Sequence, residues 1–418
     1  MKLSAFGEKF AASSGIVELM DDLGIALNEN PDALFMGGGN PARIPLVEKC
    51  YQQTLQEILD DPALRHNMLG IYQSPQGDLE FRSEIAHYLK SQFNWPLSAS
   101  NISVCNGSQS AFFLIFNMLA GAMPDASQRQ IHLPLAPEYL GYADSGLSEN
   151  FFRATKPSIE LLDNHLFKYH IDFEQLTLSE STAALCVSRP TNPTGNVLTD
   201  QEIGRLDSLA LKHDIPLIVD GAYGLPFPNI LFNQATPHWN ENTILLLSLS
   251  KLGLPGARTG IIVASEEFSR ALSNANTISS LACGTLGPAI GKRLLANNTL
   301  DPLCKEHIQP FYAERAQRYV DMFRGLMNPE LPYRVHKPEG AFFLWLWLDQ
   351  LPISSHDLYQ ILKARNVLVV PGEPFFIGLD SSWPHTRQCL RISYAQDEDS
   401  VRRGFDIIAA EVERAYRQ

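Results

Sequence analysis

The chain has 418 residues, of which 45% are hydrophobic and 19% are charged, and its formal net charge is −13. This composition is typical of a globular protein with roughly two or three domain-sized units. The negative charge argues against nucleic acid as a partner. The densest apolar stretches, residues 111–122 and 341–348, are too short to cross a bilayer, so we expect no membrane partner either.

The N-terminal residues include acidic side chains early and no long apolar core, which is not the pattern of a signal peptide. The six cysteines are scattered and form no C-x-x-C pair. Such cysteines are typically reduced and mostly buried, so we expect a cytoplasmic protein. Residues 1–35 are predicted to form a helical arm. Three consecutive glycines follow, residues 37–39, and their bare backbone suits either a flexible turn or the wall of a pocket.

A helix is predicted over residues 45–60. Tyr72, Gly77 and Arg82 then form a Y-x-x-x-x-G-x-x-x-x-R pattern, and a second helix with apolar residues at helical spacing begins near Leu79. Tyr72 is either a packed tyrosine or one that reaches a ligand site, and the pattern alone does not separate the two.

A strand over residues 101–105 leads into the sequence N-G-S-Q at 106–109, which opens an apolar helix through Leu119. Free backbone N–H groups and the positive end of the helix dipole converge at such a start. An anion site is therefore predicted here, with simple capping by Ser108 as the alternative.

The next strands end in polar or aromatic residues. The strand over 131–135 precedes Tyr139 and Tyr142, either of which offers a flat face to a ligand ring, and Tyr139 fits better. The strand over 183–188 precedes the turn N-P-T-G, in which Asn192 can donate a hydrogen bond. Thr199 and Glu202, three residues apart, predict the capped start of a helix.

The strand over 215–219 ends at Asp220, with Tyr223 close behind. A carboxylate at the carboxyl end of a buried strand points into the crevice where α/β sheets bind ligands. Capping of a helix is the alternative for a single aspartate. Asn192 and this pair follow two consecutive predicted strands.

Two apolar strands at 244–247 and 261–263 flank Ser248, Lys251 and Arg258. Burial lowers the pKa of a lysine, and a neutral amine can attack a carbonyl. Hydroxyls and a guanidinium suit a phosphate, whereas a lysine without such neighbours is usually a solvated charge. A reactive amine beside a phosphate site indicates a Schiff base with a phosphorylated aldehyde, which is pyridoxal phosphate.

The C-terminal part has helical patterns to about residue 327, strands at 340–348 and 367–370, and a helix near 355–364. Arg391 follows in another predicted strand, where Leu390 and Ile392 face the opposite side. A surface salt bridge is the alternative to a ligand site for this arginine.

The S-x-S-K…P-G-x-R-x-G pattern at 248–260 resembles the lysine motif of the fold-type I aminotransferases of class I/II. The matches continue in family order from Gly38 to Arg391. The resemblance implies an α/β fold-type I protein, with a large doubly wound, mostly parallel-sheet domain and a smaller α+β domain. It implies an N-terminal arm and part of the small domain at 1–45, the large domain at 46–305 and the remaining small domain at 306–418.

The resemblance also implies a pyridoxal 5'-phosphate-dependent homodimer that transfers an amino group between a small neutral amino acid and a 2-oxo acid. It implies catalytic roles for Lys251, Asp220 and Tyr223, and no metal. Phe6, Phe10 and Ile16 are further candidates for the substrate side-chain pocket. The implied cofactor-binding residues are Tyr72 (from the partner subunit), Gly107, Ser108, Gln109, Tyr139, Asn192, Asp220, Tyr223, Ser248, Lys251 and Arg258, and the implied substrate-binding residues are Gly38, Asn192 and Arg391.

Two features depart from the aspartate aminotransferase pattern. Lys251 and Arg258 are one residue closer together, and no arginine for a second substrate carboxylate is identifiable. Three other functions remain open: a broader neutral amino acid aminotransferase, a β-lyase that uses the same cofactor, and a cofactor-binding regulator. The regulator is disfavoured because such proteins carry an added DNA-binding domain, for which this chain leaves no room.

Overall fold

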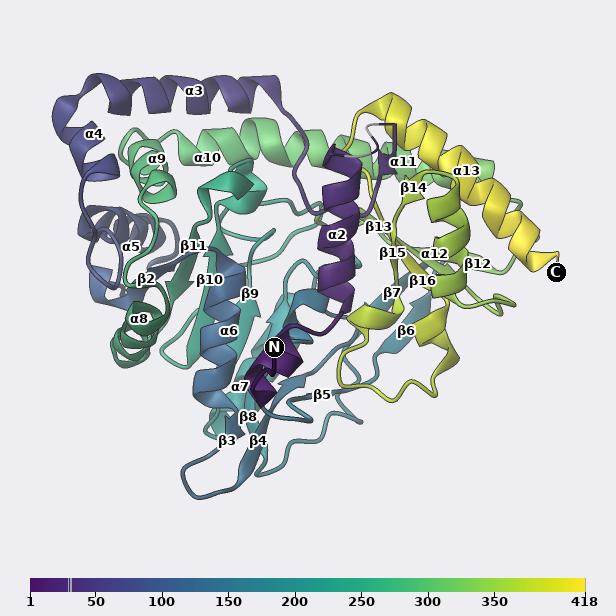
Figure 1. Cartoon of the computed structure of the whole chain (residues 1–418), viewed down its shortest axis with the longest axis horizontal. Helices are drawn as coiled ribbons and strands as arrows, with labels where there is room; N and C mark the ends of the chain where they lie inside the picture. Colours follow the sequence, from purple (N-terminus) through teal and green to yellow (C-terminus); the bar gives the residue numbers. More distant parts are fainter. Residues whose placement is uncertain (29, 31, 418) are drawn as a thin grey trace.

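The computed structural model describes residues 1–28, 30 and 32–417, and Figure 1 shows two β-sheets flanked by helices. The larger sheet has eight strands in this described part of the chain, in the order β2-β11-β10-β9-β8-β4-β3, with β5 beside β4. All run in one direction except β11 and β3. The strands are β2 (Ile102–Cys105), β3 (Gly121–Ala122), β4 (Gln128–Leu133), β5 (Phe152–Ala154), β8 (Thr182–Ser188), β9 (Leu217–Asp220), β10 (Thr243–Ser248) and β11 (Gly260–Val263).

Helices cover both faces of this sheet, which is why its central strands are apolar throughout. On one face Ile218 packs in a cluster with α6 (Ser108–Leu119) and α8 (Glu266–Ser280). On the other face Leu217 and Val219 pack in a cluster with α5 (Leu79–Phe93) and α7 (Asp200–Lys212). The predicted doubly wound architecture is therefore confirmed.

The second sheet has the order β15-β16-β13-β12-β7-β6 within the described residues. Its first four strands come from the C-terminal part of the chain, whereas β6 and β7 form a hairpin between β5 and β8. The hairpin joins the sheet because β7 pairs in parallel with β12. The strands are β6 (Ser158–Leu161), β7 (Leu166–His170), β12 (Tyr333–His336), β13 (Phe343–Leu348), β15 (Val370–Pro371) and β16 (Cys389–Ser393).

The N-terminal arm is helical as predicted, with α1 (Ala5–Phe10) and α2 (Gly15–Asn28). Strand β1 (Leu34–Phe35) then pairs with β14 (Val367–Leu368) beside the second sheet. In Figure 1, α12 and α13 pack beside this sheet, while α3 crosses the top of the molecule. The remaining helices are α3 (Pro45–Asp60), α4 (Pro62–Leu69), α9 (Leu286–Ala296), α10 (Leu300–Pro302), α11 (Gln309–Leu326), α12 (Ser355–Ala364) and α13 (Glu398–Tyr416).

Local sequence signals correspond to observed elements. The predicted capping box is present at the start of α7, where the side chain of Thr199 accepts from the backbone of Glu202 and the reverse contact also forms. The proposed division of the chain at residues 45 and 305 leaves the β6–β7 hairpin in the large domain by sequence, although it completes the sheet of the small one. We therefore propose that the hairpin belongs with the small domain.

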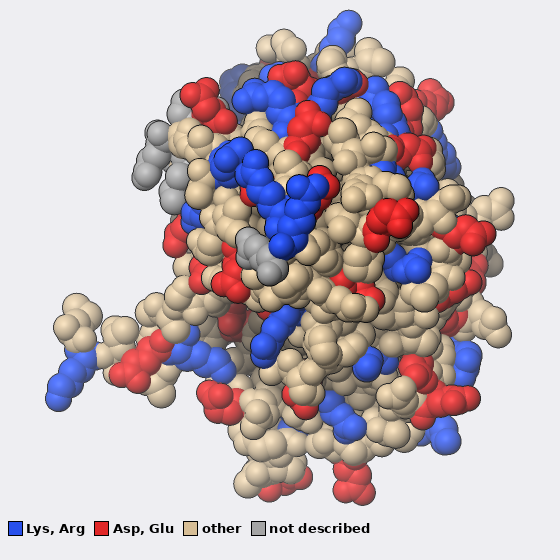
Figure 2. Space-filling model, turned by 90° about the vertical axis from the view of Figure 1, so that its right-hand side faces the viewer, with Lys and Arg blue, Asp and Glu red and all other residues tan. Residues whose placement is uncertain are grey.

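The surface carries charges of both signs, which are interspersed over the face shown in Figure 2. Within the described residues, no helix is both long enough and apolar enough to cross a membrane. The six cysteines, all in the described part of the chain, are free thiols, and five of them are buried.

Candidate active site

A cavity of about 820 Å³ opens where the carboxyl ends of β8, β9 and β10 meet the second sheet. Ser188, Asp220 and Ser248 each end one of these strands and line the cavity. Parallel strands bring their carboxyl ends to one edge, so residues far apart in sequence converge there. The volume is in the range of small-molecule and cofactor sites.

Lys251 lies on the short helical turn Ser250–Leu252 directly after β10. Its Nζ donates a hydrogen bond of 2.6 Å to the carbonyl oxygen of Gly39. Burial, followed by the positive charge of Arg391, lowers the pKa of Lys251 to about 8. A substantial fraction of this amine is therefore neutral near that pH, whereas an exposed lysine remains charged.

Asp220 is held on both carboxylate oxygens. Oδ2 accepts from the hydroxyl of Tyr142 at 2.7 Å, and Oδ1 accepts from the backbone N–H of Ala222 at 2.9 Å. Burial raises the pKa of Asp220, while these two hydrogen bonds act in the opposite direction. Tyr142, the second candidate for a ring-stacking tyrosine, is fully buried and has no place in the cavity lining, whereas Tyr139 lines the cavity.

A second carboxylate, Glu138, is buried close to Asp220. The backbone N–H of Ser188 donates to its Oε1 at 2.8 Å, and the Ser188 hydroxyl donates to its Oε2. Burial raises the pKa of Glu138 to about 8. Glu138 is therefore mostly protonated at neutral pH, and the neighbouring carboxylate of Asp220 contributes to this upward shift of its pKa.

The opposite end of the cavity has the features of a phosphate site. Gly107, with φ of +89°, precedes α6, and Ser108 and Gln109 open that helix. A Cβ on Gly107 would lie 2.3 Å from Nη2 of Arg258, so only glycine lets this guanidinium approach the helix start. Ser248, Ser250 and Arg258 also line this region. Ser250 was not among the predicted site residues, although the S-x-S-K spacing contains both serines.

Arg391 reaches the cavity from β16. Its Nη1 donates to Oδ1 of Asn192 at 2.7 Å and its Nη2 donates to the carbonyl oxygen of Gly37 at 2.5 Å. The guanidinium carbon lies 4.5 Å from the ring centroid of Phe343 and 5.1 Å from that of Phe375. Burial lowers the pKa of Arg391 to about 10, and its buried Nε has no partner among the described residues. These contacts fix the planar guanidinium of Arg391 and leave some of its N–H donors, including that of Nε, without a partner among the described residues.

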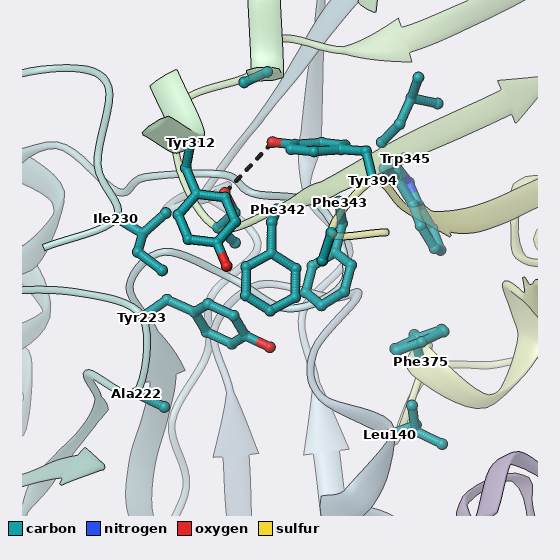
Figure 3. Packing of buried hydrophobic residues seen from close by; sticks show 14 of the residues in the cluster. Leu140, Ala222, Tyr223, Ile230, Tyr312, Phe342, Phe343, Trp345, Phe375 and Tyr394 are labelled. Carbon is teal, nitrogen blue, oxygen red and sulfur yellow. Dashed lines mark hydrogen bonds between the residues drawn. The ribbon is translucent and has the colours of Figure 1, made fainter. Parts of the chain in front are cut away.

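Tyr223 lines the cavity, and Figure 3 shows its ring beside the buried rings of Phe342 and Phe343. The ring of Tyr223 packs edge-on against Phe342 and Phe343, with centroid distances of 5.2 and 5.7 Å. The Nζ of Lys251 lies 5.1 Å from the Tyr223 centroid. The Tyr223 hydroxyl lies on the side of the lysine. A Cβ added to Gly39 would lie 4.0 Å from this hydroxyl and 3.3 Å from Nζ of Lys251.

The three glycines at 37–39 have three different neighbours. Gly37 accepts from Arg391, Gly38 lines the cavity, and Gly39 accepts from Lys251. A Cβ on Gly38 would lie 2.3 Å from the ring of Phe35, and one on Gly39 would lie 3.3 Å from Nζ of Lys251. The contact of Gly39 was not predicted, because sequence alone does not fix the register within three identical residues.

The remaining wall is apolar and comes from the N-terminal arm. Ile16, Leu19 and Met20 on α2, with Phe35 on β1, line the cavity. Of the three predicted pocket candidates, Ile16 is in this lining, Phe10 lines a neighbouring cavity under the arm, and Phe6 is exposed. Tyr72 is 83% exposed and does not line the cavity of its own chain.

Comparisons with known proteins agree with this geometry. The sequence model described as aminotransferase class I and II matches residues 42–408. The chain is 48% identical to valine–pyruvate aminotransferase of Escherichia coli K12 over the full length of both chains.

The chain belongs to the class I and II aminotransferase family.

Two solved structures extend the comparison to this aminotransferase's fold. One is described as a putative amino-acid aminotransferase from Psychrobacter arcticum 273-4, with 42% identity, complete coverage of both chains and a TM-score of 0.96. The other is valine–pyruvate aminotransferase of Salmonella typhimurium LT2, with 47% identity, coverage of 97% of this chain and 100% of that chain, and a TM-score of 0.89.

Aminotransferases of this family depend on pyridoxal phosphate, and the residues of the cavity fit that cofactor. The start of α6 with Arg258 suits the phosphate, and the anionic Asp220 suits a protonated ring nitrogen. A Cβ on Gly260 would lie 2.7 Å from the backbone N of Ser108, so bare backbone closes this end. Gln109 Oε1 is buried without a partner among the described residues. Lys251 supplies the amine that the cofactor's aldehyde requires.

The low pKa of Lys251 predicts how the cofactor-free aminotransferase takes up pyridoxal phosphate. Since the neutral amine is the nucleophile, the rate of uptake should rise with pH through about 8 and then level off. The growth of the visible absorption band after mixing measures this rate. Replacing Arg391 by leucine should move the midpoint to higher pH, because the charge of Arg391 helps to lower this pKa. A rate that keeps rising to the pKa of an ordinary lysine, about 10.4, would contradict the assignment.

Proposed function

We propose that this aminotransferase moves the amino group between L-valine and pyruvate, giving 2-oxoisovalerate and L-alanine. One observation carries the proposal. The cations in the described cavity lining are Lys251, Arg258 and Arg391, and each already has a role, so no cation is left for a second substrate carboxylate. The facing wall is apolar. A substrate with one carboxylate and a small aliphatic side chain fits both facts, and valine–pyruvate aminotransferases are among the relatives.

Bound pyridoxal phosphate supplies an aldehyde that condenses with amino groups and a ring that withdraws electrons from the substrate α-carbon. We propose that Arg391 binds the substrate carboxylate through paired hydrogen bonds with its free donors. Asn192 keeps the guanidinium in orientation through the 2.7 Å contact to Nη1. The substrate side chain then points to the apolar wall of Ile16, Leu19 and Phe35.

Lys251 is the proposed proton carrier. Once its amine is free, the lowered pKa allows the amine to accept the proton of the substrate α-carbon near neutral pH. The same amine would later donate this proton to the cofactor. The carbonyl oxygen of Gly39 positions the amine by accepting a hydrogen bond of 2.6 Å from it. Asp220 would hold the proton on the ring nitrogen, because hydrogen bonds from Tyr142 and Ala222 favour its carboxylate form.

We also propose a homodimer in which the exposed Tyr72 of one subunit reaches the phosphate end of its partner's cavity. Leu69, Ile71 and Tyr72 are exposed by 70%, 48% and 83%, and three large exposed side chains within four residues support an intersubunit contact. A cytoplasmic location is proposed because all six cysteines, which lie in the described part of the chain, are free thiols.

The experiment that tests the proposed substrates is amino transfer to pyruvate by the purified enzyme, with L-valine or L-glutamate as donor and L-alanine as the product measured. Valine should exceed glutamate by at least about 100-fold in kcat/KM, since a second carboxylate would be buried without a partner. Glutamate ahead of valine would discard the valine assignment and leave the aminotransferase. Pyruvate and ammonia released from an elimination substrate would instead support a β-lyase.

Two neighbouring residues on α2 give this experiment a matched pair of variants. Ile16 lines the cavity, whereas Val17 lines only the neighbouring cavity under the arm. Ile16→Ala should lower kcat/KM for valine by about tenfold and leave alanine less affected, because the lost contact is worth on the order of 1 kcal/mol for the larger side chain. Val17→Ala should leave the ratio of valine to alanine unchanged. Equal ratios in both variants would remove Ile16 from the side-chain pocket.

A further inference from the structure

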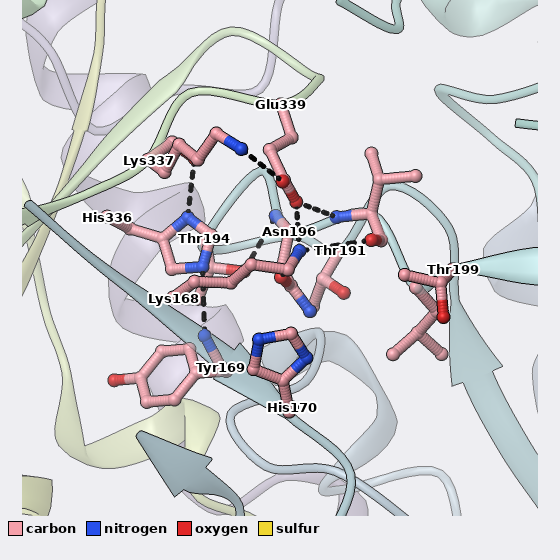
Figure 4. Close-up of polar contacts among 12 residues, drawn as sticks. Lys168, Tyr169, His170, Thr191, Thr194, Asn196, Thr199, His336, Lys337 and Glu339 are labelled. Carbon is pink, nitrogen blue, oxygen red and sulfur yellow. Dashed lines mark hydrogen bonds and ion pairs between the residues drawn. The ribbon is translucent and has the colours of Figure 1, made fainter. Parts of the chain in front are cut away.

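A buried ion pair lies outside the cavity, where three segments far apart in the sequence meet (Figure 4). Nζ of Lys168 on β7 contacts Oε2 of Glu339, which precedes β13, and the two residues are 171 positions apart. Their side chains are only 7% and 4% exposed. Neither residue lines the cavity.

Stability alone gives no reason for charges at this place. Removing both groups from water costs free energy that their attraction repays only with excellent geometry, and apolar replacements of such pairs are often as stable. A positional role is the attested reason to retain a buried pair. The contacts that Lys168 and Glu339 make with a third segment identify what is positioned.

The third segment is the loop that carries Asn192. Lys168 Nζ donates to Oδ1 of Asn196 at 2.9 Å and to the carbonyl oxygen of Val197 at 3.2 Å. The N–H of Val197 donates to Glu339 Oε2 at 3.1 Å. Both backbone groups of Val197 are therefore held by opposite charges. The loop also packs tightly against the segment of Glu339, because a Cβ on Gly195 would lie 2.5 Å from the carbonyl oxygen of Gly340.

The loop is closed on itself, so fixing its end also fixes its beginning. The N–H of Thr191 donates to the carbonyl oxygen of Asn196 at 2.8 Å, and the N–H of Gly195 donates to that of Thr191 at 2.8 Å. Asn192 follows Thr191 directly, and its Oδ1 accepts from Arg391. Hydrogen bonds, together with the peptide bond between Thr191 and Asn192, thus connect the ion pair to the guanidinium in the cavity.

We propose that the Lys168–Glu339 ion pair is a positioning device that fixes Asn192, and through Asn192 the guanidinium of Arg391, in the geometry that binds the substrate carboxylate. Lys168 and Glu339 are positioning residues, since neither touches the cavity. The inference rests on the proposed function only in taking Arg391 as the carboxylate site, and it holds for whichever amino acid is the best donor.

The first test is Glu339→Gln in the holoenzyme, with the donor that the unaltered enzyme uses fastest. KM for that donor should rise by about tenfold, the factor of one charge-assisted hydrogen bond, and kcat should change less, because Arg391 binds the carboxylate throughout the reaction. Glu411→Gln is the matched control. Glu411 on α13 is 6% exposed in its side chain and pairs with Arg365, which follows α12, and with Arg414. This variant should lose thermal stability but keep KM.

A second variant removes the side-chain contact of Lys168 with Asn196, leaves the two contacts with Val197 and does not break the pair. It tests the proposal if Glu339→Gln does not fold. Asn196→Ala should raise the dissociation constant of isovalerate, a carboxylate without an amino group, by about tenfold in calorimetry on the holoenzyme. If both the KM values and the isovalerate affinity of the folded variants equal those of the unaltered enzyme, the pair has no positioning role. If valine proves to be a poor donor, the substrate proposal fails but the result for the ion pair remains valid. The two proposals can therefore be tested independently.

Discussion

Lys251→Ala should abolish amino transfer, with kcat falling by a factor of at least about 10⁴, because the variant loses both the amine that holds the cofactor and the base that moves the α-proton. The side chain is well placed for both tasks: it ends at the carboxyl edge of the larger sheet, and its amine is held by Gly39 with a pKa of about 8. Single-turnover conversion of the donor, followed by the yield of the 2-oxo acid, measures the loss.

Two controls separate chemistry from folding. Lys305→Ala removes a lysine that is 60% exposed in its side chain and lies outside the cavity lining, so it should retain turnover. Added methylamine should restore a small part of the Lys251→Ala activity, since a free amine can carry the proton in a cavity that has lost its own. Full activity of Lys251→Ala without any added amine would refute the assignment of this lysine.

The second large effect is expected for Asp220→Asn. Asparagine has the same shape but no negative charge, so it cannot keep a proton on the ring nitrogen, and kcat should fall by about 10²–10⁴. The melting temperature should change little, because the amide oxygen can still accept from the N–H of Ala222 and the amide nitrogen can donate to the hydroxyl oxygen of Tyr142. The absorption spectrum of the bound cofactor at several pH values gives a readout that a structural change alone would not alter.

Tyr142→Phe is the graded counterpart of that variant. It removes one of two hydrogen bonds to the carboxylate and leaves the charge, so kcat should fall by about tenfold rather than by several powers of ten. An Asp220→Asn variant with a near-normal rate would remove the electron-withdrawing role assigned to this end of the cavity. Equal losses in both variants would instead indicate that geometry, and not charge, matters here.

Much of the site was predictable because its residues follow strongly patterned elements. Asp220, Ser248 and Lys251 each stand at or just after the end of an apolar strand, and the carboxyl ends of parallel strands must meet at one edge. The glycine and serine that open α6 belong to an equally local pattern. Motif order along the chain then named Asn192 and Arg391, which the structure brings within 2.7 Å of each other.

Other parts could not be predicted, because they depend on contacts between distant segments. The sequence favoured Tyr139 over Tyr142 but gave no packing reason, which the contacts of Tyr142 with Phe112 and Phe116 supply. The buried state of Glu138 follows from its contact with Ser188, fifty positions away. No local sequence pattern identifies the partner of the β6–β7 hairpin. The hairpin pairs with β12, and strands β8 to β11 of the larger sheet lie between the two in the sequence.

That pairing has a consequence for the chain while it is being made. Strand β7 emerges long before β12, since Lys168 and Glu339 are 171 residues apart, and a ribosome adding about 5–20 residues per second takes on the order of 10–30 s to cover that distance. During this time β7 is an open strand edge of the kind that pairs with other chains. We expect the charge of Lys168 to protect the nascent edge against such association until Glu339 arrives and neutralises it.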